Sequence, residues 1–533
     1  MKLSKLTFAV ATALTASVTT SAFAMVLYVD NKTKQIYTEA GPGRQILGSF
    51  EQVQEGIPVK NGGDVSELRG KLELQDNQIK ALEEHAKASE EEGMVEIKKD
   101  GGIEFKSRDG NFKMAVNGRM QVDSQVNTNQ NLTSNFLPGA GAQMPATLDN
   151  GMGLRRGRIG VEGTFFKNTD YKFEYDFTRG NGTTASGVTD AFARYNFSTP
   201  FSVKVGAFKE PFSLEEATSN RYITFIERNM AVNTFVDNFN TYKMGIGANY
   251  SADRWQIGTS MQTEGVGAYN NAYGTNATQS ALNAQGGVNR NGGGGDTSWE
   301  VNARVTGMPW MESNTKFWHI GTSGSYINVN NNYKSDGSYS NGGIIFANGI
   351  GNNVDRTAIL NTGNLTGAKL GAAQAQHLTR FGAESAVVYG PFSTQGEYIR
   401  TDVSGTGYGN ESLSGYYGYA TYFLTGESRN YKAKTGAWER IKPTHNFDMK
   451  GGWGAWELAA GYDSMNLNSG SIQGGRASTA KFGVNWYVNP HIRLMANYIH
   501  ALDINTGTVA NANSKAFNNS DLDIIESRVQ IDW

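Results

Sequence analysis

The sequence predicts an all-β transmembrane barrel preceded by a short amphipathic helix. Apolar and polar residues alternate with a period of two from about residue 102 to the end, and long and short connections alternate between these segments. After the N-terminus, no apolar run is long enough for a membrane-spanning helix. The hydrophobic content of 38% and the 65 glycines also argue against a bundle of membrane helices.

The first residues have the parts of a secretory signal peptide. Lys2 and Lys5 precede an apolar and small-residue run of about 13 residues, and this region closes on Ala22-Phe23-Ala24, a typical cleavage site. The run is too short for the roughly 20 residues of a spanning helix. We therefore expect residues 1–24 to be a signal peptide and the mature chain to begin at Met25. The absence of cysteine suits an oxidising compartment.

Two segments are expected between the signal peptide and the barrel. In residues 25–60, two short apolar runs flank an Asp-Asn turn and predict a small hairpin. Residues 61–93 predict a helix with a heptad seam, because apolar positions recur at spacings of three and four residues. The seam consists of Val65, Leu68, Leu72, Gln75, Ile79, Leu82 and Ala86. We expect a periplasmic coiled coil that joins several chains, with a solvated linker as the alternative.

Residues 101–533 are expected to form the barrel. In residues 112–123 one parity is apolar or small and the other is polar, which in a transmembrane barrel places one face toward lipid and the other toward a lumen. The C-terminal residues 528–533 form an alternating strand that ends on Trp533. This region holds 36 basic and 35 acidic residues. Such a balance argues against nucleic-acid binding, and any ion selectivity must come from the placement of charges.

Several multi-residue strings are more specific than alternation. They include Gly153-Leu154-Arg155-Arg156-Gly157-Arg158-Ile159-Gly160 and the segments 171–177, 205–215, 222–228, 424–429, 451–458 and 485–490. These strings resemble the phosphate-selective porin O and P family from about residue 103 to the end. The resemblance implies a porin of about 16 antiparallel strands, a homotrimer surrounded by outer-membrane lipid of a Gram-negative bacterium, with an inward-folded loop that narrows each pore. It implies no cofactor or metal.

Basic residues on the lumen side are the candidate anion pathway. Parity places Arg119, Arg156, Arg158, Lys172, Arg194 and Lys204 on the inward face, while Arg155 lies at a strand end. Arginine offers a planar fork of donors that matches phosphate oxygens. By the resemblance, Arg155, Arg156 and Arg158 would select anions. The alternative is that inward arginines pair with inward acids such as Glu174 and only stiffen the wall.

The segment from Lys209 to Thr241 is too long for a turn and is the candidate constriction loop. Its aromatic residues would pack on the inner wall, while Lys209, Arg221 and Arg228 would project into the pore. The competing interpretation is an extracellular lid without a role in selectivity.

Three other functions remain as alternatives. An outer-membrane hydrolase finds little support, because the six histidines are scattered and no G-x-S-x-G motif is present, so we expect no enzyme activity. A structural protein that links the outer membrane to the periplasm would have a closed lumen and no conductance. A porin for general or other solutes also remains open, because the barrel region is nearly neutral.

Overall fold

The structure is a computed structural model of the 533-residue chain. It describes residues 24–30, 36–51, 62–91, 94–97, 102–107, 109–131, 147–178, 187–237, 242–265, 298–329, 344–366 and 372–533. Two compact units are present, residues 1–88 and 89–533. No described helix is both long enough and apolar enough to cross a bilayer. The expected signal peptide, apart from its last residue, lies outside the described residues.

A small antiparallel sheet forms within the first unit. It contains β1 (Ala24–Asp30), β2 (Ile36–Tyr37) and β3 (Arg44–Glu51) in the order β2-β1-β3. The two strands of the expected hairpin pair with each other, with Tyr28 opposite Tyr37. The third strand was not expected from the sequence, and it pairs with the other edge of β1.

The helix α1 (Gly62–Glu91) follows this sheet. The described side chains of its heptad seam are exposed, and Leu72, Ile79 and Leu82 have 64%, 53% and 58% of their surface accessible. The side chains of Val65, Leu68 and Ala86 lie outside the described ones. Large apolar side chains at heptad spacing are thus presented to solvent within a single chain.

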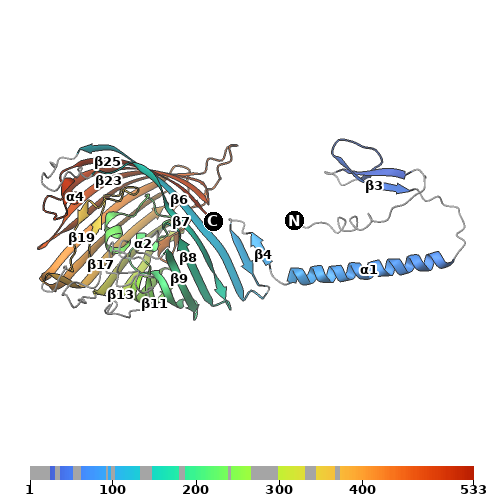
Figure 1. Ribbon diagram of the computed structural model, residues 1–533, viewed down its shortest axis with the longest axis horizontal. Coiled ribbons are helices and arrows are strands. Elements are labelled where there is room, and N and C mark those ends of the chain that lie inside the picture. The colour runs from blue at the N-terminus through green and yellow to red at the C-terminus, as the bar shows by residue number, and fades with distance from the viewer. Residues whose placement is uncertain are drawn as a thin grey trace. The chain divides into compact units, whose positions relative to one another are not determined.

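Sixteen antiparallel strands close into a barrel, as the family resemblance implied (Figure 1). The pairing of the last strand with the first closes the cylinder. In order the strands are β6 (Phe112–Asn131), β7 (Gly151–Phe165), β8 (Thr169–Asp176), β9 (Val188–Asn196), β10 (Phe201–Lys209), β11 (Tyr242–Ser251), β12 (Trp255–Gly265), β13 (Trp299–Ser313), β14 (Lys316–Asn328), β17 (Gln374–Tyr389), β18 (Phe392–Thr406), β19 (Tyr408–Phe423), β22 (Ala455–Ser469), β23 (Ile472–Asn489), β24 (Ile492–Asn505) and β25 (Asp521–Asp532).

The first barrel strand has two partners on the same edge. The hairpin β4 (Met94–Ile97) and β5 (Ile103–Lys106) pairs with the beginning of β6, where Ile103 lies opposite Val116. From Arg119 onward the same edge pairs with β25. At the junction, Trp533 and Gly118 exchange two backbone hydrogen bonds.

The alternation of side chains has the orientation expected of a membrane barrel. On β7, Arg156 and Arg158 are buried, whereas Leu154 and Ile159 are half exposed. Polar residues therefore face the inside and apolar residues face outward, where lipid covers them. Short links such as residues 166–168 join strands at one end of the barrel, where the long connection of residues 424–454 also lies. The long connections that follow β6, β10, β12, β14 and β24 lie at the opposite end.

Further short elements lie in the connections. The long connection between β10 and β11 contains the helices α2 (Leu214–Ala217) and α3 (Met230–Val232) and the π-helix η1 (Asn233–Asp237). Other connections hold the two-stranded sheets β15 (Ala347–Asn348) with β16 (Leu360–Asn361) and β20 (Tyr431–Lys432) with β21 (Ala437–Trp438), and the helix α4 (Ala512–Ala516).

Candidate functional site

The candidate constriction loop lies inside the barrel. We name its described residues 210–237 the inner loop. Its backbone carbonyls accept hydrogen bonds from inward side chains of the wall: Arg493 donates to Ile223 at 2.8 Å, and Arg528 donates to Ile226 at 2.6 Å. Buried carbonyl groups must be hydrogen-bonded, and here charged wall residues satisfy them. The wall therefore holds the irregular backbone of the inner loop in place.

The amide groups of the inner loop are held in the same way from another side. Glu397 on β18 accepts hydrogen bonds from the N–H groups of Leu214 and Glu215, at 3.1 and 2.8 Å. Apolar side chains complete the attachment, as the sequence led us to expect for the aromatic residues. Phe225 packs edge-on against Tyr419, with 5.5 Å between the ring centroids. The inner loop is thus attached to β18, β19, β24 and β25.

The carboxylate of Glu174 lies close to three arginines. Glu174 on β8 lies 2.6 Å from Arg119, 2.8 Å from Arg158 and 3.7 Å from Arg221 of the inner loop. Arg158 also forms an ion pair of 2.7 Å with Asp176. The side chains of Arg119, Arg158, Glu174 and Asp176 are all buried on the inner face of the wall.

A second carboxylate joins the inner loop to three arginines of the wall. Glu227 lies 2.9 Å from Arg155, 3.5 Å from Arg156 and 3.1 Å from Arg528. Arg528 in turn pairs with Asp123 at 2.6 Å. Arg528 was missed as a site residue, although alternation in the C-terminal strand was a signal that could have found it.

Guanidinium groups outnumber carboxylates in this ion-pair network. Its members are Arg119, Arg155, Arg156, Arg158, Arg221 and Arg528 with Asp123, Glu174, Asp176 and Glu227. Six basic and four acidic groups leave two positive charges in excess. Glu526 lies next on the inward face of β25, and neither of its carboxylate oxygens has a hydrogen-bond partner among the described residues. If it is ionised, one positive charge remains.

Basic side chains continue along β8, β9 and β10 with more access to water. Lys172 pairs with Asp190 at 2.6 Å and is 24% exposed, and Arg194 pairs with Asp170 at 2.7 Å and is 42% exposed. Lys204 lies opposite Arg194 in the strand register, with its ammonium 4.1 Å from the centroid of the Phe208 ring. Within the described parts of the chain, Lys204 forms no ion pair. It is therefore a basic group of the wall that no described carboxylate contacts as an ion pair, although the charge of Asp190 acts on it from a longer distance.

The three basic residues expected in the constriction have different surroundings. Lys209 pairs with Glu216 at 2.7 Å, and Arg221 keeps 13% of its side chain accessible next to Glu174. Arg228 is 1% exposed and is held by Glu216 at 3.0 Å and Asp237 at 3.2 Å. Arg228 thus lies within the inner loop instead of projecting into the pore.

Two further segments that the sequence analysis did not assign to the lumen contact the inner wall. In residues 344–366, the N–H groups of Asn353, Val354 and Asp355 all donate to the side-chain oxygen of Gln125, at 3.0 to 3.2 Å. In residues 424–454, the Trp438 indole donates to Gln395 at 2.6 Å. Both wall residues are buried inward groups, so both segments enter the barrel. The length of the second, which is too great for a turn, was the available signal.

These features define an outer-membrane porin: a closed barrel with an apolar outside, a charged inner wall and an inward-folded loop. The chain belongs to the phosphate-selective porin O and P family, whose model matches residues 126–533. This family and this fold are those of a channel in the Gram-negative outer membrane rather than of an enzyme.

Two relatives are similar along most of the chain. Porin O of Pseudomonas aeruginosa is 27% identical over 428 residues, which cover 76% of this chain and 87% of the relative. An uncharacterised protein of Caulobacter vibrioides is 26% identical over 406 residues, covering 76% and 71%. Among solved structures, OmpT of Vibrio cholerae is 10% identical, covers 79% of this chain and 98% of its own, and has a TM-score of 0.44. The channel DcaP of Acinetobacter baumannii is 12% identical, covers 80% of this chain and 99% of its own, and has a TM-score of 0.42.

Proposed function

We propose that the barrel is a water-filled, anion-selective channel through which phosphate or similar small anions diffuse. The observation that carries this proposal is that Lys204 forms no ion pair with a described residue, at the end of a row of basic groups that begins in the arginine network and continues through Lys172 and Arg194. A fixed positive charge in a narrow lumen raises the local concentration of anions and repels cations. The description of the family, phosphate-selective porin O and P, agrees with phosphate as the solute.

Passage would occur by exchange of partners along this row. An anion that reaches Lys172 or Arg194 competes with Asp190 or Asp170 for the same donors. Each site is therefore weak enough for release, and several weak sites in series favour conduction over retention. Arginine forks in the network would supply paired donors that match phosphate geometry.

The test is the reversal potential of the purified protein in a planar bilayer under a KCl gradient, repeated with added phosphate. We expect anion selectivity and a block of the chloride current by phosphate. Lys204→Gln should lower both, whereas Lys167→Gln, which changes an exposed lysine in the link between β7 and β8, should lower neither. Cation selectivity would contradict the anion pathway. An absence of conductance would favour the structural linking protein.

We also propose that the helix α1 joins three chains as a coiled coil in the periplasm. Leu72, Ile79 and Leu82 are large apolar residues at heptad positions, and all are more than half exposed in a single chain. A seam of this kind is buried when identical helices associate. Short coiled coils are weak alone, but barrels that associate in the membrane would hold the helices at a high effective concentration.

A further inference from the structure

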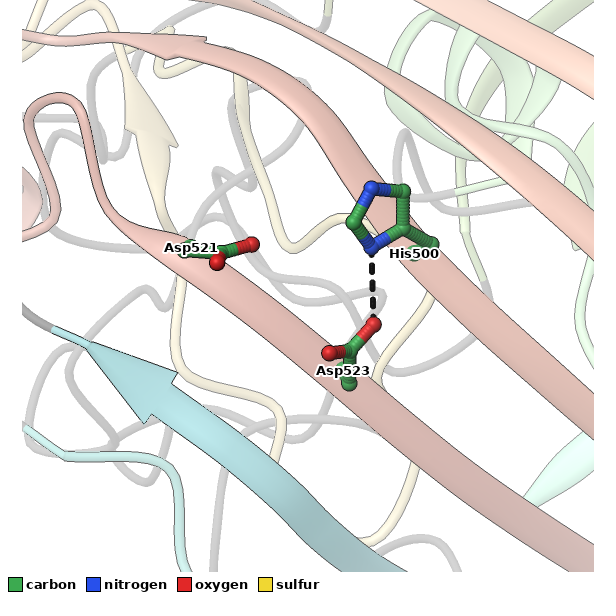
Figure 2. Close-up of side chains that lie close together, drawn as sticks. All are labelled: His500, Asp521 and Asp523. Carbon is green, nitrogen blue, oxygen red and sulfur yellow. Dashed lines mark hydrogen bonds and ion pairs between the residues drawn. The ribbon is translucent and has the colours of Figure 1, made fainter.

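A separate group of metal-ligating side chains lies on the outer face of the barrel. His500 on β24 lies directly opposite Asp523 on β25, and Asp521 lies two residues before Asp523 on the same strand (Figure 2). Their neighbours Ile499 and Ile524 are fully buried on the inner face. The three side chains therefore point outward, beside the long connection between β24 and β25 and away from the proposed anion pathway.

The geometry of this group is close to that of a metal site. The imidazole Nδ1 of His500 is 2.7 Å from Oδ1 of Asp523, and one ligand atom from each of the three residues lies within 4.8 Å of the others. Ligand atoms around a tetrahedral zinc ion are about 3.3 Å apart at the usual bond lengths. Asp521 is exposed, so its side chain is not held away from the other two by packing.

Two neighbouring residues orient the carboxylate of Asp523. The hydroxyl of Tyr498 donates to Oδ1 of Asp523 at 2.6 Å, and the amide of Asn129 on β6 donates to Oδ2 at 3.2 Å. Hydrogen bonds of this kind hold a ligating carboxylate in place and tune its basicity. One carboxylate is thus positioned by three strands before any ion binds.

The charge of the group is also uncompensated. The side chain of Asp521 forms no ion pair or hydrogen bond with any described residue, and His500 is the only basic partner of Asp523 among them. With a neutral imidazole the group carries two negative charges. The nearby acid Asp503 differs, because Arg476 pairs with it at 3.3 Å.

We propose that His500, Asp521 and Asp523 bind one divalent transition-metal cation per chain, of the zinc class. Imidazole nitrogen favours such ions over magnesium and calcium, which prefer oxygen ligands alone. Three protein ligands leave at least one coordination position open to water on the outward side. The alternative is a hydrogen-bonded cluster that binds no metal.

Calorimetric titration with Zn²⁺ tests this proposal on the assembled, tag-free protein in detergent, at about pH 7.5 where an ordinary imidazole is neutral. We expect one saturable site per chain, weakened at least tenfold in both His500→Gln and Asp521→Asn. Two controls on the outer face should bind as the unchanged protein does: Asp503→Asn removes a paired acid, and His377→Gln removes a histidine whose partner is a tyrosine.

The absence of saturable binding would overturn the proposal, as would saturable binding that neither ligand variant weakens. Equal weakening by the controls would show that the site lies elsewhere. If His500→Gln fails to assemble, Asp521→Asn decides the question alone, because its side chain is exposed and makes no described contact that folding needs. None of these outcomes depends on ion conductance, so the result is independent of the proposed function.

Discussion

Gly118 and Trp533 meet at the seam of the barrel through two backbone hydrogen bonds, with N to O distances of 3.1 and 3.2 Å. The indole of Trp533 covers the position that a Cβ atom on Gly118 would occupy. A side chain at position 118 therefore displaces the C-terminal aromatic where it folds over the first strand.

Gly118→Ala should consequently weaken the seam. The added methyl group forces the Trp533 ring away from the strand, and overpacking of this kind destabilises by about 1–3 kcal/mol. Heat-modifiable mobility on gels should show a lower unfolding temperature for this variant. Gly153→Ala on the neighbouring strand is the control, because a Cβ atom there meets no atom within 4 Å. Equal stability of the two variants would show that the ring adapts freely.

Substitution of a buried and of an exposed lumen arginine should have different effects on the stability of the barrel but the same effect on its ion selectivity. Arg158→Gln leaves Glu174 and Asp176 short of a buried partner, so the free energy of unfolding should fall by about 3–5 kcal/mol. Arg194→Gln removes a group that is 42% exposed, so the free energy of unfolding should fall by less than about 1 kcal/mol. Both variants should reduce the anion-to-cation permeability ratio in bilayers. An unchanged ratio in both would favour the interpretation that these arginines only stiffen the wall.

Glu227→Gln should have the opposite effect on selectivity. The carboxylate of Glu227 neutralises part of the charge of Arg155, Arg156 and Arg528, and its removal leaves those groups for mobile anions. We expect stronger anion selectivity and a phosphate block at several-fold lower concentration. Glu312→Gln, at the exposed end of β13, should leave both unchanged. A weaker phosphate block in Glu227→Gln would contradict the pathway.

The stability of the folded protein should depend on pH through Glu215, a buried residue of the inner loop. Burial, and then the nearby Glu397 carboxylate, raises the pKa of Glu215 to about 8, although Arg228 and Lys481 act in the other direction. An unfolded glutamate releases its proton near pH 4.3. The folded protein therefore holds an extra proton between these values, so this residue makes stability fall as pH rises across that window and adds no further slope above it.

Thermal unfolding from about pH 4 to 9 measures this contribution against Glu215→Gln, which cannot ionise. The midpoint temperature of unfolding of the protein with Glu215 should fall more steeply with rising pH than that of the Glu215→Gln variant. Parallel curves would show that Glu215 titrates normally.

The proposed coiled coil makes a prediction about assembly. Deletion of residues 61–93 removes the seam that contains Leu72, Ile79 and Leu82, so trimers should dissociate at lower temperature on non-denaturing gels. A matched variant that replaces exposed charged residues of the same helix, Lys71→Ala with Lys80→Ala, should retain the trimer. Unchanged trimers after the deletion would support the solvated linker instead.

Much of the wall was predictable from the sequence, because a strand in a two-sided environment has a period of two. This period placed Arg156 and Arg158 on the inner face, where they lie in the structure. The partner of Arg156, Glu227, was beyond such an argument, since it lies on the inner loop 71 residues further along the chain. Local alternation sets the direction of a side chain but does not determine which distant residue meets it.

Irregular segments set the limit of the prediction. Arg228 belongs to a connection without a period, and its burial follows from the acids that surround it, Glu216 and Asp237. The entry of residues 424–454 into the barrel depends on tertiary contacts such as that of Trp438 with Gln395. Neither property is encoded in local spacing.

The double partnership of β6 has a consequence for biogenesis. Its first part is occupied by β5, but the rest of its edge is matched only by β25, the last twelve residues before Trp533. Until the C-terminus has been made and exported, the nascent sheet keeps two unpaired edges rich in exposed amide and carbonyl groups, which invite association with other chains. The cell must therefore shield an open, aggregation-prone intermediate for the whole time between synthesis of its first and its final strand.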